Sequence, residues 1–340
     1  MAKVEFRNVR KEYPLGGTLH RRVLHAVGGV SFDIGEGRIL AVVGESGCGK
    51  TTLARMLMKL HDPTEGQIRV DGVSLSDIRT RKDVFDFHAK IQMIFQDPFA
   101  SLNPAHTVED IVGRAITLHS PKLSRDAVRR GVEALLTQVG LTPPQDFMPK
   151  HPGQLSGGQR QRIVIARALA VDPEIIVADE PTSMLDVSIG IDIMNLLLDL
   201  RDNHKLTMMY ITHNLAGARY IADDIVIMYA GNAVEHGSVD EVVAMPLHPY
   251  TVLLLSSTPE PFRERPLGIH AREDLPDMQK AQTHCLFASR CPKCTDLCRQ
   301  RVPGDYRVNG RSVKCFLYAG VEHVDAPMVT AEDYMRGEDE

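Results

Sequence analysis

The stretch GESGCGKT at residues 44–51 constrains the fold of this chain more than any other feature. It follows the apolar run ILAVV and precedes the helical pattern TLARMLMKL, so it matches G-x-x-x-x-G-K-[ST] in the order strand, loop and helix. The glycines allow successive backbone N–H groups to turn inward around phosphate oxygens, and the helix N-terminus adds a partial positive charge. A glycine-rich turn that matches by chance is the alternative, and the flanking strand and helix argue against it.

The polar side chains of this phosphate-binding loop have separate predicted roles. Lys50 is expected to reach the β and γ phosphates as a mobile point charge, and Thr51 to place its hydroxyl on Mg²⁺. Cys48 occupies a position where the motif accepts any residue, so we interpret it as a small filler. The candidate nucleotide-binding residues of this segment are Gly44, Glu45, Ser46, Gly47, Cys48, Gly49, Lys50, Thr51 and Thr52.

Two regions of different character follow one another along the chain. Between residues 4 and 237, short β-branched runs alternate with helical stretches, which predicts an α/β fold with a largely parallel sheet and crossover helices. After HPYTVLLLSSTPE at residues 248–260 the chain becomes rich in Pro, Arg, Glu and Cys, with few periodic apolar residues. We therefore predict a main domain over 1–237 and an extension over 238–340, because 340 residues suffice for one fully cored domain and an appendage.

Charge and hydropathy narrow the possible partners. The net charge of −5 supplies no basic field of the kind that binding to a phosphate backbone requires, so we do not expect a nucleic-acid partner. The sequence holds no apolar run of about 18 residues, and its start lacks the basic and then apolar pattern of a signal peptide. We expect the chain to remain in the cytoplasm, where disulfides rarely persist.

A second half-site lies in IIVADE at residues 175–180, an apolar strand that ends in two carboxylates. Asp179 is expected to hold Mg²⁺, and Glu180 to polarise the attacking water. Two acidic residues at the end of a buried strand are costly without cations, which favours function over packing. Upstream, LSGGQ precedes the helical RQRIVIARALAVDP and predicts a second phosphate cradle that a single site does not use. The residues of that cradle are Leu155, Ser156, Gly157, Gly158 and Gln159.

In this order the motifs resemble those of the ATPase subunit of ABC transporters. Gln96 in MIFQDPFASLNP resembles the Q-loop residue, which in that family touches Mg²⁺ or water and signals toward the membrane partner. The D-loop corresponds to SMLD, which ends at Asp186, and the switch histidine that contacts the γ-phosphate corresponds to His213 in YITHN. Tyr13 in KEYP matches the aromatic that stacks on adenine. A lone Gln, Tyr or His is more often structural, and the shared order of the motifs decides against that interpretation.

The resemblance implies both a fold and a mechanism. The fold is a P-loop NTPase with a RecA-like core sheet, an antiparallel β portion, a helical subdomain at about 96–158 that grips a permease, and a small irregular C-terminal extension. Two ATPase domains pair head to tail, so Ser156, Gly157 and Gly158 would serve the partner's ATP. The implied catalytic residues are Glu180, His213, Gln96 and Lys50, and the implied Mg²⁺ ligands are Thr51, Gln96 and Asp179.

Two positions depart from the family pattern. Met184 replaces the small residue of the D-loop, and Asn214 replaces the Asp that usually follows the switch histidine. Neither change removes a group expected to contact the phosphate or the metal. We therefore still predict hydrolysis, with a changed rate as the possible effect.

The region after the second carboxylate strand resembles one subclass, the dipeptide, oligopeptide and nickel importers, through its HPYT segment. Within the usual pair of ATPases the chain is most similar to the F-type member. The implied assembly is a heterodimer with a sister ATPase, two transmembrane permease subunits and an extracytoplasmic solute-binding protein, at the cytoplasmic face of the inner membrane as a peripheral subunit. Peptides are the implied solute, with nickel and oligosaccharides as alternatives. A soluble ABC ATPase of DNA repair or translation is a further alternative, although the chain lacks a long coiled-coil insertion or a second ATPase half.

Five of the six cysteines lie between residues 285 and 315. Structural zinc favours close pairs, and only Cys291 and Cys294 form one. Four thiolates on longer irregular loops suit a [4Fe–4S] cluster, and the resemblance implies such a cluster as a structural staple, with Cys294 as the spare thiol. Zinc and the absence of any metal remain alternatives. The implied cluster ligands are Cys285, Cys291, Cys298 and Cys315.

Overall fold

The computed structural model describes residues 2–15, 22–256 and 276–335. Residues 257–260 of HPYTVLLLSSTPE therefore lie outside the described residues. So do residues 16–21 of GGTLHRRVLHAVGGVSF, a basic segment at 16–32 through which the chain resembles the F-type member. The chain divides into two compact units. Unit 1 comprises residues 35–38 and 77–211, and unit 2 comprises residues 2–34, 39–76 and the chain from 212 onward.

Unit 2 contains an antiparallel sheet of four strands in the order β2-β1-β4-β5. Its strands are β1 Ala2–Leu15, β2 Arg22–Gly35, β4 Glu65–Val70 and β5 Val73–Ser74. β1 and β4 run antiparallel, with Val4 opposite Val70 and Phe6 opposite Ile68. Phe6 is fully buried and stacks on Phe32 with 4.4 Å between ring centroids, and together with the buried Val4 it forms part of the inner face.

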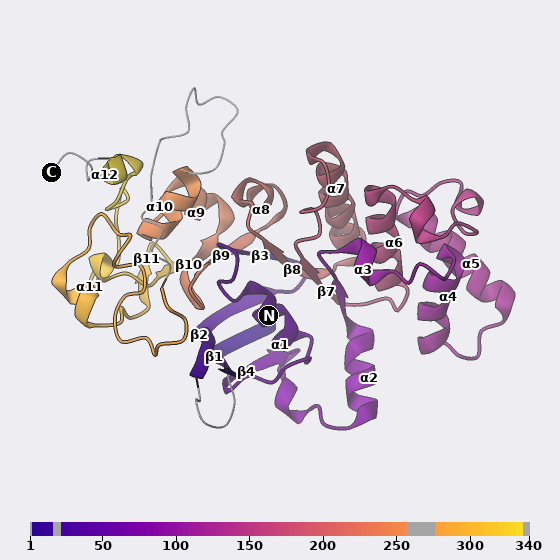
Figure 1. The fold of residues 1–340 in the computed structure, drawn as a ribbon, viewed down its shortest axis with the longest axis horizontal. Coiled ribbons are helices and arrows are strands. Elements are labelled where there is room, and N and C mark those ends of the chain that lie inside the picture. Colours follow the sequence, from indigo (N-terminus) through magenta and orange to yellow (C-terminus); the bar gives the residue numbers. More distant parts are fainter. Residues whose placement is uncertain (1, 16–21, 257–275, 336–340) are drawn as a thin grey trace. The chain divides into compact units, whose positions relative to one another are not determined.

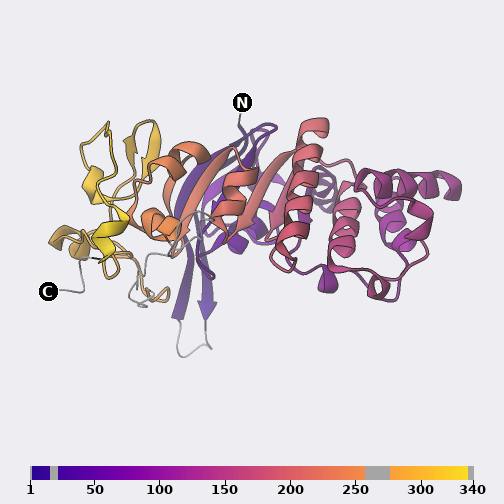
Figure 2. The same cartoon turned by 90° about the horizontal axis from the view of Figure 1, so that it is seen from above.

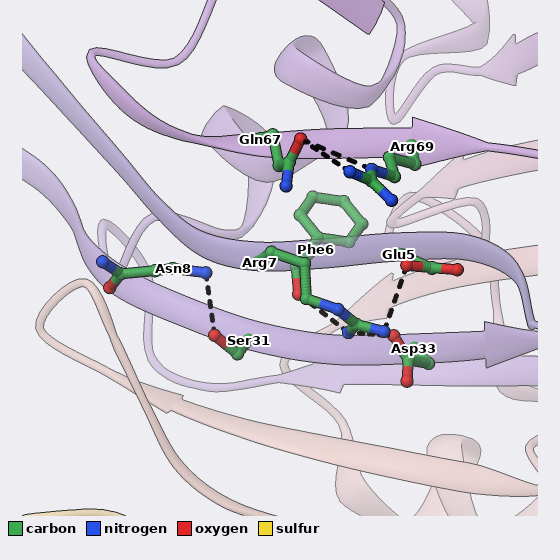
Figure 3. Close-up of polar contacts among 8 residues, drawn as sticks. All are labelled: Glu5, Phe6, Arg7, Asn8, Ser31, Asp33, Gln67 and Arg69. Carbon is green, nitrogen blue, oxygen red and sulfur yellow. Dashed lines mark hydrogen bonds and ion pairs between the residues drawn. The ribbon is translucent and has the colours of Figure 1, made fainter. Parts of the chain in front are cut away.

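Polar side chains tie neighbouring strands of this sheet together (Figure 3). Arg7 on β1 bonds to Asp33 on β2 and lies 3.1 Å from a Glu5 carboxylate oxygen. The backbone N–H of Asn8 donates to the Ser31 hydroxyl at 2.8 Å. These contacts fix the register of β1 against β2, because a slip by one residue would turn each side chain to the opposite face.

Unit 2 also holds the strands of a larger sheet in the order β11-β12-β10-β9-β3. β3 and β9 are parallel, and the other neighbours are antiparallel. The strands are β3 Ile39–Val43, β9 Asp224–Tyr229, β10 Asn232–Ser238, β11 Tyr306–Val308 and β12 Arg311–Val313. The C-terminal extension thus adds a hairpin to this sheet and is more regular than its sequence suggests.

The helices of unit 2 follow the strands closely. They are α1 Lys50–Leu57, α8 Leu215–Ile221, α9 Val239–Ala244, α10 Pro249–Ser256, α11 Asp296–Gln300 and α12 Ala331–Met335, with the short 3₁₀ helices η1 Leu75–Asp77, which ends at the boundary with unit 1, and η4 Phe316–Tyr318. α12 lies beside α10 in both views (Figures 1 and 2), and the Tyr334 hydroxyl donates to the Pro249 carbonyl at 2.7 Å.

Unit 1 contains three parallel strands in the order β8-β7-β6, accompanied by helices. The strands are β6 Ile91–Ile94, β7 Ile175–Asp179 and β8 Thr207–Thr212. The helices are α2 Arg81–Lys90, α3 Pro98–Ser101, α4 Val108–His119, α5 Arg125–Gln138, α6 Gly157–Leu169 and α7 Val187–His204, with the 3₁₀ turns η2 Pro144–Asp146 and η3 Pro152–Gln154. Every residue of β7 is buried, as expected for a parallel strand covered on both faces.

Several helices of unit 1 begin where the sequence supplies an oxygen for the first free N–H groups. The side chains of Thr80, Thr107 and Ser124 accept from the backbone three residues later, at the starts of α2, α4 and α5. Figure 1 shows α4, α5 and α6 packed beside one another. α4 and α5 lie within the helical subdomain expected at about 96–158, whereas α6 begins at its end, so the bounds of the subdomain stay a prediction. The α/β class with an antiparallel portion is confirmed. Among the described residues, no helix is both long and apolar enough to cross a membrane.

Candidate nucleotide site

The phosphate-binding loop of unit 2 joins β3 to α1, as its sequence predicts. Gly49 has φ of 101°, and a Cβ on Gly44 would lie 2.2 Å from the Met228 carbonyl oxygen, so both positions require glycine. Lys50 begins α1 and is 5% exposed. Its ammonium donates to the carbonyls of Gly44 at 2.7 Å and Glu45 at 2.9 Å, so the charge is held in place and is less mobile than expected.

Glu45 in this loop has partners that the sequence did not indicate. Its backbone N–H donates to the Tyr250 hydroxyl at 3.0 Å. Its two carboxylate oxygens accept from the two terminal nitrogens of Arg290, at 3.1 and 3.0 Å. The sequence indicates HPYT as a marker of a subclass and the cysteine segment as a metal site, and no sequence signal links residues 245 positions apart.

Cys48 is buried in the same loop, with its sulfur 3.9 Å from the Lys50 ammonium. Burial raises the pKa of the Cys48 thiol, and the positive charge of Lys50 lowers it by a smaller amount. A protonated, enclosed thiol matches the interpretation of a small filler.

Two candidate catalytic side chains meet in unit 1. Gln96 follows β6 and Glu180 follows β7, and these parallel strands end at the same edge. The Gln96 amide nitrogen donates to a Glu180 carboxylate oxygen at 3.1 Å. Glu180 has φ of 47°, a left-handed conformation that a non-glycine residue adopts at a cost of about 1–3 kcal/mol. Such strain beside a polar contact is typical of a functional site.

Asp179, the last residue of β7, is only 6% exposed. Mg²⁺ takes oxygen ligands, with one or two carboxylates alongside substrate phosphates and water. A buried carboxylate followed by the Gln96–Glu180 pair fits this donor set in unit 1, and the Thr51 hydroxyl in α1 fits it in unit 2. The Mg²⁺ ligand assignments remain predictions.

The LSGGQ segment forms the start of α6. Ser156 is the N-cap, and its hydroxyl accepts from the Gln159 N–H at 3.3 Å while the Gln159 side chain accepts from the Ser156 N–H at 3.0 Å. A Cβ on Gly158 would lie 2.6 Å from Ile189 Cγ2, and one on Gly157 would lie 3.3 Å from Leu185. The signature glycines therefore have a packing role against α7 in addition to the predicted phosphate contact.

The remaining expected site residues are exposed or half-buried. Asp186 precedes α7 and is exposed, and His213 is exposed after β8. Asn214 caps α8, where its side-chain oxygen accepts from the Gly217 N–H at 3.1 Å, a role that Asn and Asp fill equally well. Tyr13 on β1 makes an edge contact with His61 at 5.6 Å. Their catalytic and binding roles remain predictions.

The C-terminal cysteines gather in unit 2. Burial raises the pKa of Cys285 to about 11 and those of Cys291 and Cys315 to about 12, and neighbouring thiols add to each increase. The Cys285 N–H donates to the Cys298 carbonyl at 3.0 Å. Among the described residues, however, no group of three or more His, Cys, Asp or Glu has an arrangement that could hold a metal ion.

The fold and these motifs define a P-loop ATPase of the ABC type. The family model described as "ABC transporter" matches residues 27–183, and the model "Oligopeptide/dipeptide transporter, C-terminal region" matches residues 234–298. The chain belongs to the ATP-binding proteins of the oligopeptide and dipeptide group of ABC transporters. It is an ATPase coupled to transport. The resemblance to the oligopeptide and dipeptide importers that its motifs indicated is thus confirmed.

Relatives and solved structures agree with this assignment. The oligopeptide transport ATP-binding protein AppF of Bacillus subtilis is 41% identical over 327 residues, which cover 93% of this chain and 97% of AppF. OppF of Salmonella typhimurium is 43% identical over 285 residues, 83% of this chain and 84% of OppF. The ATP-binding cassette MJ0796, solved as a dimer with ADP and Pi, is 32% identical with a TM-score of 0.62, over 69% of this chain and 98% of that one.

Proposed function

We propose that this chain hydrolyses ATP to power the import of peptides through an ABC transporter, at the cytoplasmic face of the membrane. One contact within unit 2 carries the proposal: Glu45 of the P-loop donates a hydrogen bond to Tyr250 of the C-terminal HPYT segment. In the same loop, the Lys50 ammonium is held by a hydrogen bond to the Gly44 carbonyl. The names of the relatives, which are oligopeptide and dipeptide transport proteins, support peptides as the solute.

The proposed chemistry divides the work among named side chains. Lys50 binds the β and γ phosphates with a fixed ammonium, and Glu180 accepts a proton from the attacking water. Gln96 orients Glu180 through their hydrogen bond, and His213 contacts the γ-phosphate. Mg²⁺, held by Thr51, Gln96 and Asp179, would neutralise charge on the phosphates.

An apolar surface at the start of α7 supports pairing with a sister ATPase. Met184, Val187 and Ile191 are 52%, 82% and 41% exposed, and the spacing of Val187 and Ile191 aligns them on one face of the helix. Exposed apolar groups of this kind are typical of an interaction surface. In the proposed heterodimer, Ser156 and the two signature glycines contact the partner's ATP.

A groove in unit 1 supports the proposed contact with a permease. The cavity has a volume of about 780 Å³ and is lined mainly by residues of α4 and α5. Its charged lining comprises Glu109, Asp110, Arg114, Arg125, Arg129 and Arg167. A short cytoplasmic helix of a permease with acidic residues would complement the four arginines.

Purification from the native membrane tests the assembly. We expect two permease subunits and a second ATPase to accompany the tagged chain, and peptide to stimulate ATP hydrolysis in vesicles that contain the solute-binding protein. Stimulation by nickel or an oligosaccharide, but not by peptide, would replace the proposed solute. Association with nucleic acid or ribosomes and no permease would favour the soluble ATPase of DNA repair or translation.

We also propose that Cys285, Cys291, Cys298 and Cys315 ligate a [4Fe–4S] cluster, with zinc as the alternative. The number of thiols in this segment and the hydrogen bond from the Cys285 N–H to the Cys298 carbonyl support this donor set. Because burial raises the pKa of the Cys285, Cys291 and Cys315 thiols, metal binding has to displace their protons. The cluster would be structural, since the sequence implies no electron partner or redox substrate.

Anaerobic purification with metal and sulfide analysis tests the cluster. We expect a brown protein with iron and sulfide, which Cys291→Ser loses and the matched control Cys294→Ser retains. Colourless protein with stoichiometric zinc would support the alternative, and protein without metal would exclude both.

A further inference from the structure

Glu45 of the phosphate-binding loop is held from three directions. Its N–H donates to Tyr250, its carbonyl accepts from Lys50, and its carboxylate accepts two hydrogen bonds from Arg290. Lys50 and Arg290 thus bind the same residue, one through the backbone and the other through the side chain. Any displacement of the Glu45 backbone moves an acceptor of the lysine.

Arg290 is placed for this contact by the C-terminal extension. It stands between Cys285 and Cys291, and its side chain is 8% exposed. The guanidinium lies 5.7 Å from the ring centroids of both Tyr229 and Phe287. Cation–π contacts and burial hold the charge in one orientation, unlike a surface ion pair between mobile side chains.

The aromatic residues around Arg290 continue to the loop itself. Tyr250 packs against Tyr229 with 4.6 Å between ring centroids and against Phe287 with 5.6 Å. The same Tyr250 accepts the Glu45 N–H. One buried cluster therefore supports both the backbone and the carboxylate of Glu45.

We propose that Arg290 is a positioning residue for ATP binding, through which the C-terminal extension sets the affinity of the phosphate-binding loop. Arg290 does not touch the nucleotide in this scheme. It fixes Glu45, Glu45 fixes the carbonyl that Lys50 contacts, and Lys50 binds the phosphates. The extension then acts on the ATP site from within the same unit, independently of the transported solute.

A double-mutant cycle on the full-length protein tests this series of contacts. The variants are Arg290→Gln, Glu45→Gln and the double variant, and the control Lys293→Gln removes a charge three residues from Arg290 that pairs with Asp333. ATP affinity is measured by calorimetry, and KM and kcat of hydrolysis are measured separately. Thermal unfolding and metal content are followed in each variant.

We expect Arg290→Gln to weaken ATP binding and to raise KM about five- to tenfold, with kcat changed less than about twofold, because one half-buried, charge-assisted bidentate contact is lost. The double variant should bind ATP no more weakly than the single variant with the lower ATP affinity, since each single substitution already removes the same Arg290–Glu45 contact. Arg290→Lys should restore part of the affinity. Lys293→Gln should bind like the wild type.

Three results would overturn the proposal. The first is wild-type ATP affinity in Arg290→Gln, and the second is multiplication of the two single effects in the double variant. The third is an equal loss in Lys293→Gln, which would indicate a general disturbance of the extension. None of these three results bears on the proposed peptide solute, because the experiment measures ATP binding and hydrolysis and not transport.

Discussion

Glu180 combines a strained backbone with a carboxylate held by Gln96, and this combination makes its role testable. We expect Glu180→Gln to retain ATP binding and to lose hydrolysis by about a hundredfold or more, because the amide cannot accept the proton of the attacking water. The measurement is ATP turnover in the assembled transporter together with nucleotide affinity.

The control for this variant lies just before the same strand. Glu174 precedes β7 and lies 3.8 Å from the Lys90 ammonium, so Glu174→Gln changes a carboxylate at the opposite end of the strand. It should retain turnover. Near wild-type turnover in Glu180→Gln would show that another group accepts the proton.

His248 should govern part of the acid sensitivity of the fold. Burial lowers its pKa from 6.5 to about 3, so the folded chain keeps it neutral while the unfolded chain protonates it below pH 6.5. A lowered histidine pKa contributes stability that is present above 6.5 and is lost as the pH falls toward 3, by about 2 kcal/mol between pH 7 and pH 5.

His248→Asn isolates this contribution. The His248 ring nitrogen accepts the Tyr250 N–H at 3.0 Å, and an Asn oxygen can replace that acceptor without titrating. We expect the urea midpoint of the variant to depend less on pH between 7 and 5 than that of the wild type. If the urea midpoints of the two proteins changed equally with pH, His248 would not be the source of this acid sensitivity.

At the scale of elements, α6 and α7 meet where the signature glycines allow close approach. A methyl group on Gly158 would lie 2.6 Å from Ile189 Cγ2, so Gly158→Ala should lower the free energy of unfolding by about 1–3 kcal/mol. Ile189→Ala removes the clashing carbon, and the double variant should recover stability relative to Gly158→Ala. Urea unfolding of the three variants measures this.

The same experiment separates packing from nucleotide binding. If the double variant regains stability but ATP hydrolysis by the complex stays low, Gly158 also serves the partner's nucleotide. If stability is unchanged in Gly158→Ala, the helices move apart readily and the packing role is wrong.

At the scale of the whole molecule, the C-terminal extension is part of a sheet of unit 2. β12 pairs with β10, with Glu235 opposite Val313, and the buried Glu235 carboxylate lies 3.5 Å from Arg311. Removal of all residues after Ser256 would expose the edge of β10 and leave Glu235 without its cation. We expect melting about ten degrees lower, or aggregation.

Arg311→Met tests the charge without the truncation, because it leaves both strands present. Differential scanning calorimetry should show a lowered melting temperature that Glu235→Gln in the same chain partly restores. Unchanged melting in both the truncated chain and Arg311→Met would mean that the main domain is stable without the extension.

The parts of the fold and of the site that depend on short, local patterns could be predicted from the sequence. The loop at 44–51 required a strand before it and a helix after it, and Glu180 was expected at the end of a strand. The contact of Arg290 with Glu45 was not predictable, because a single Arg in an irregular segment carries no local signal for its distant partner. The hairpin of β11 and β12 was missed for a related reason, since three-residue strands are too short for a period to be recognised.

The Gln96–Glu180 hydrogen bond has a consequence for how much ATP the transporter consumes. The Gln96 amide holds one oxygen of the Glu180 carboxylate through a hydrogen bond, so the direction in which the second oxygen faces water depends on where Gln96 lies. We therefore expect the rate of ATP hydrolysis to depend on the position of Gln96. Gln96 lies just before α3, so a displacement of this segment would turn Glu180 away from water and limit the waste of ATP in an idle transporter.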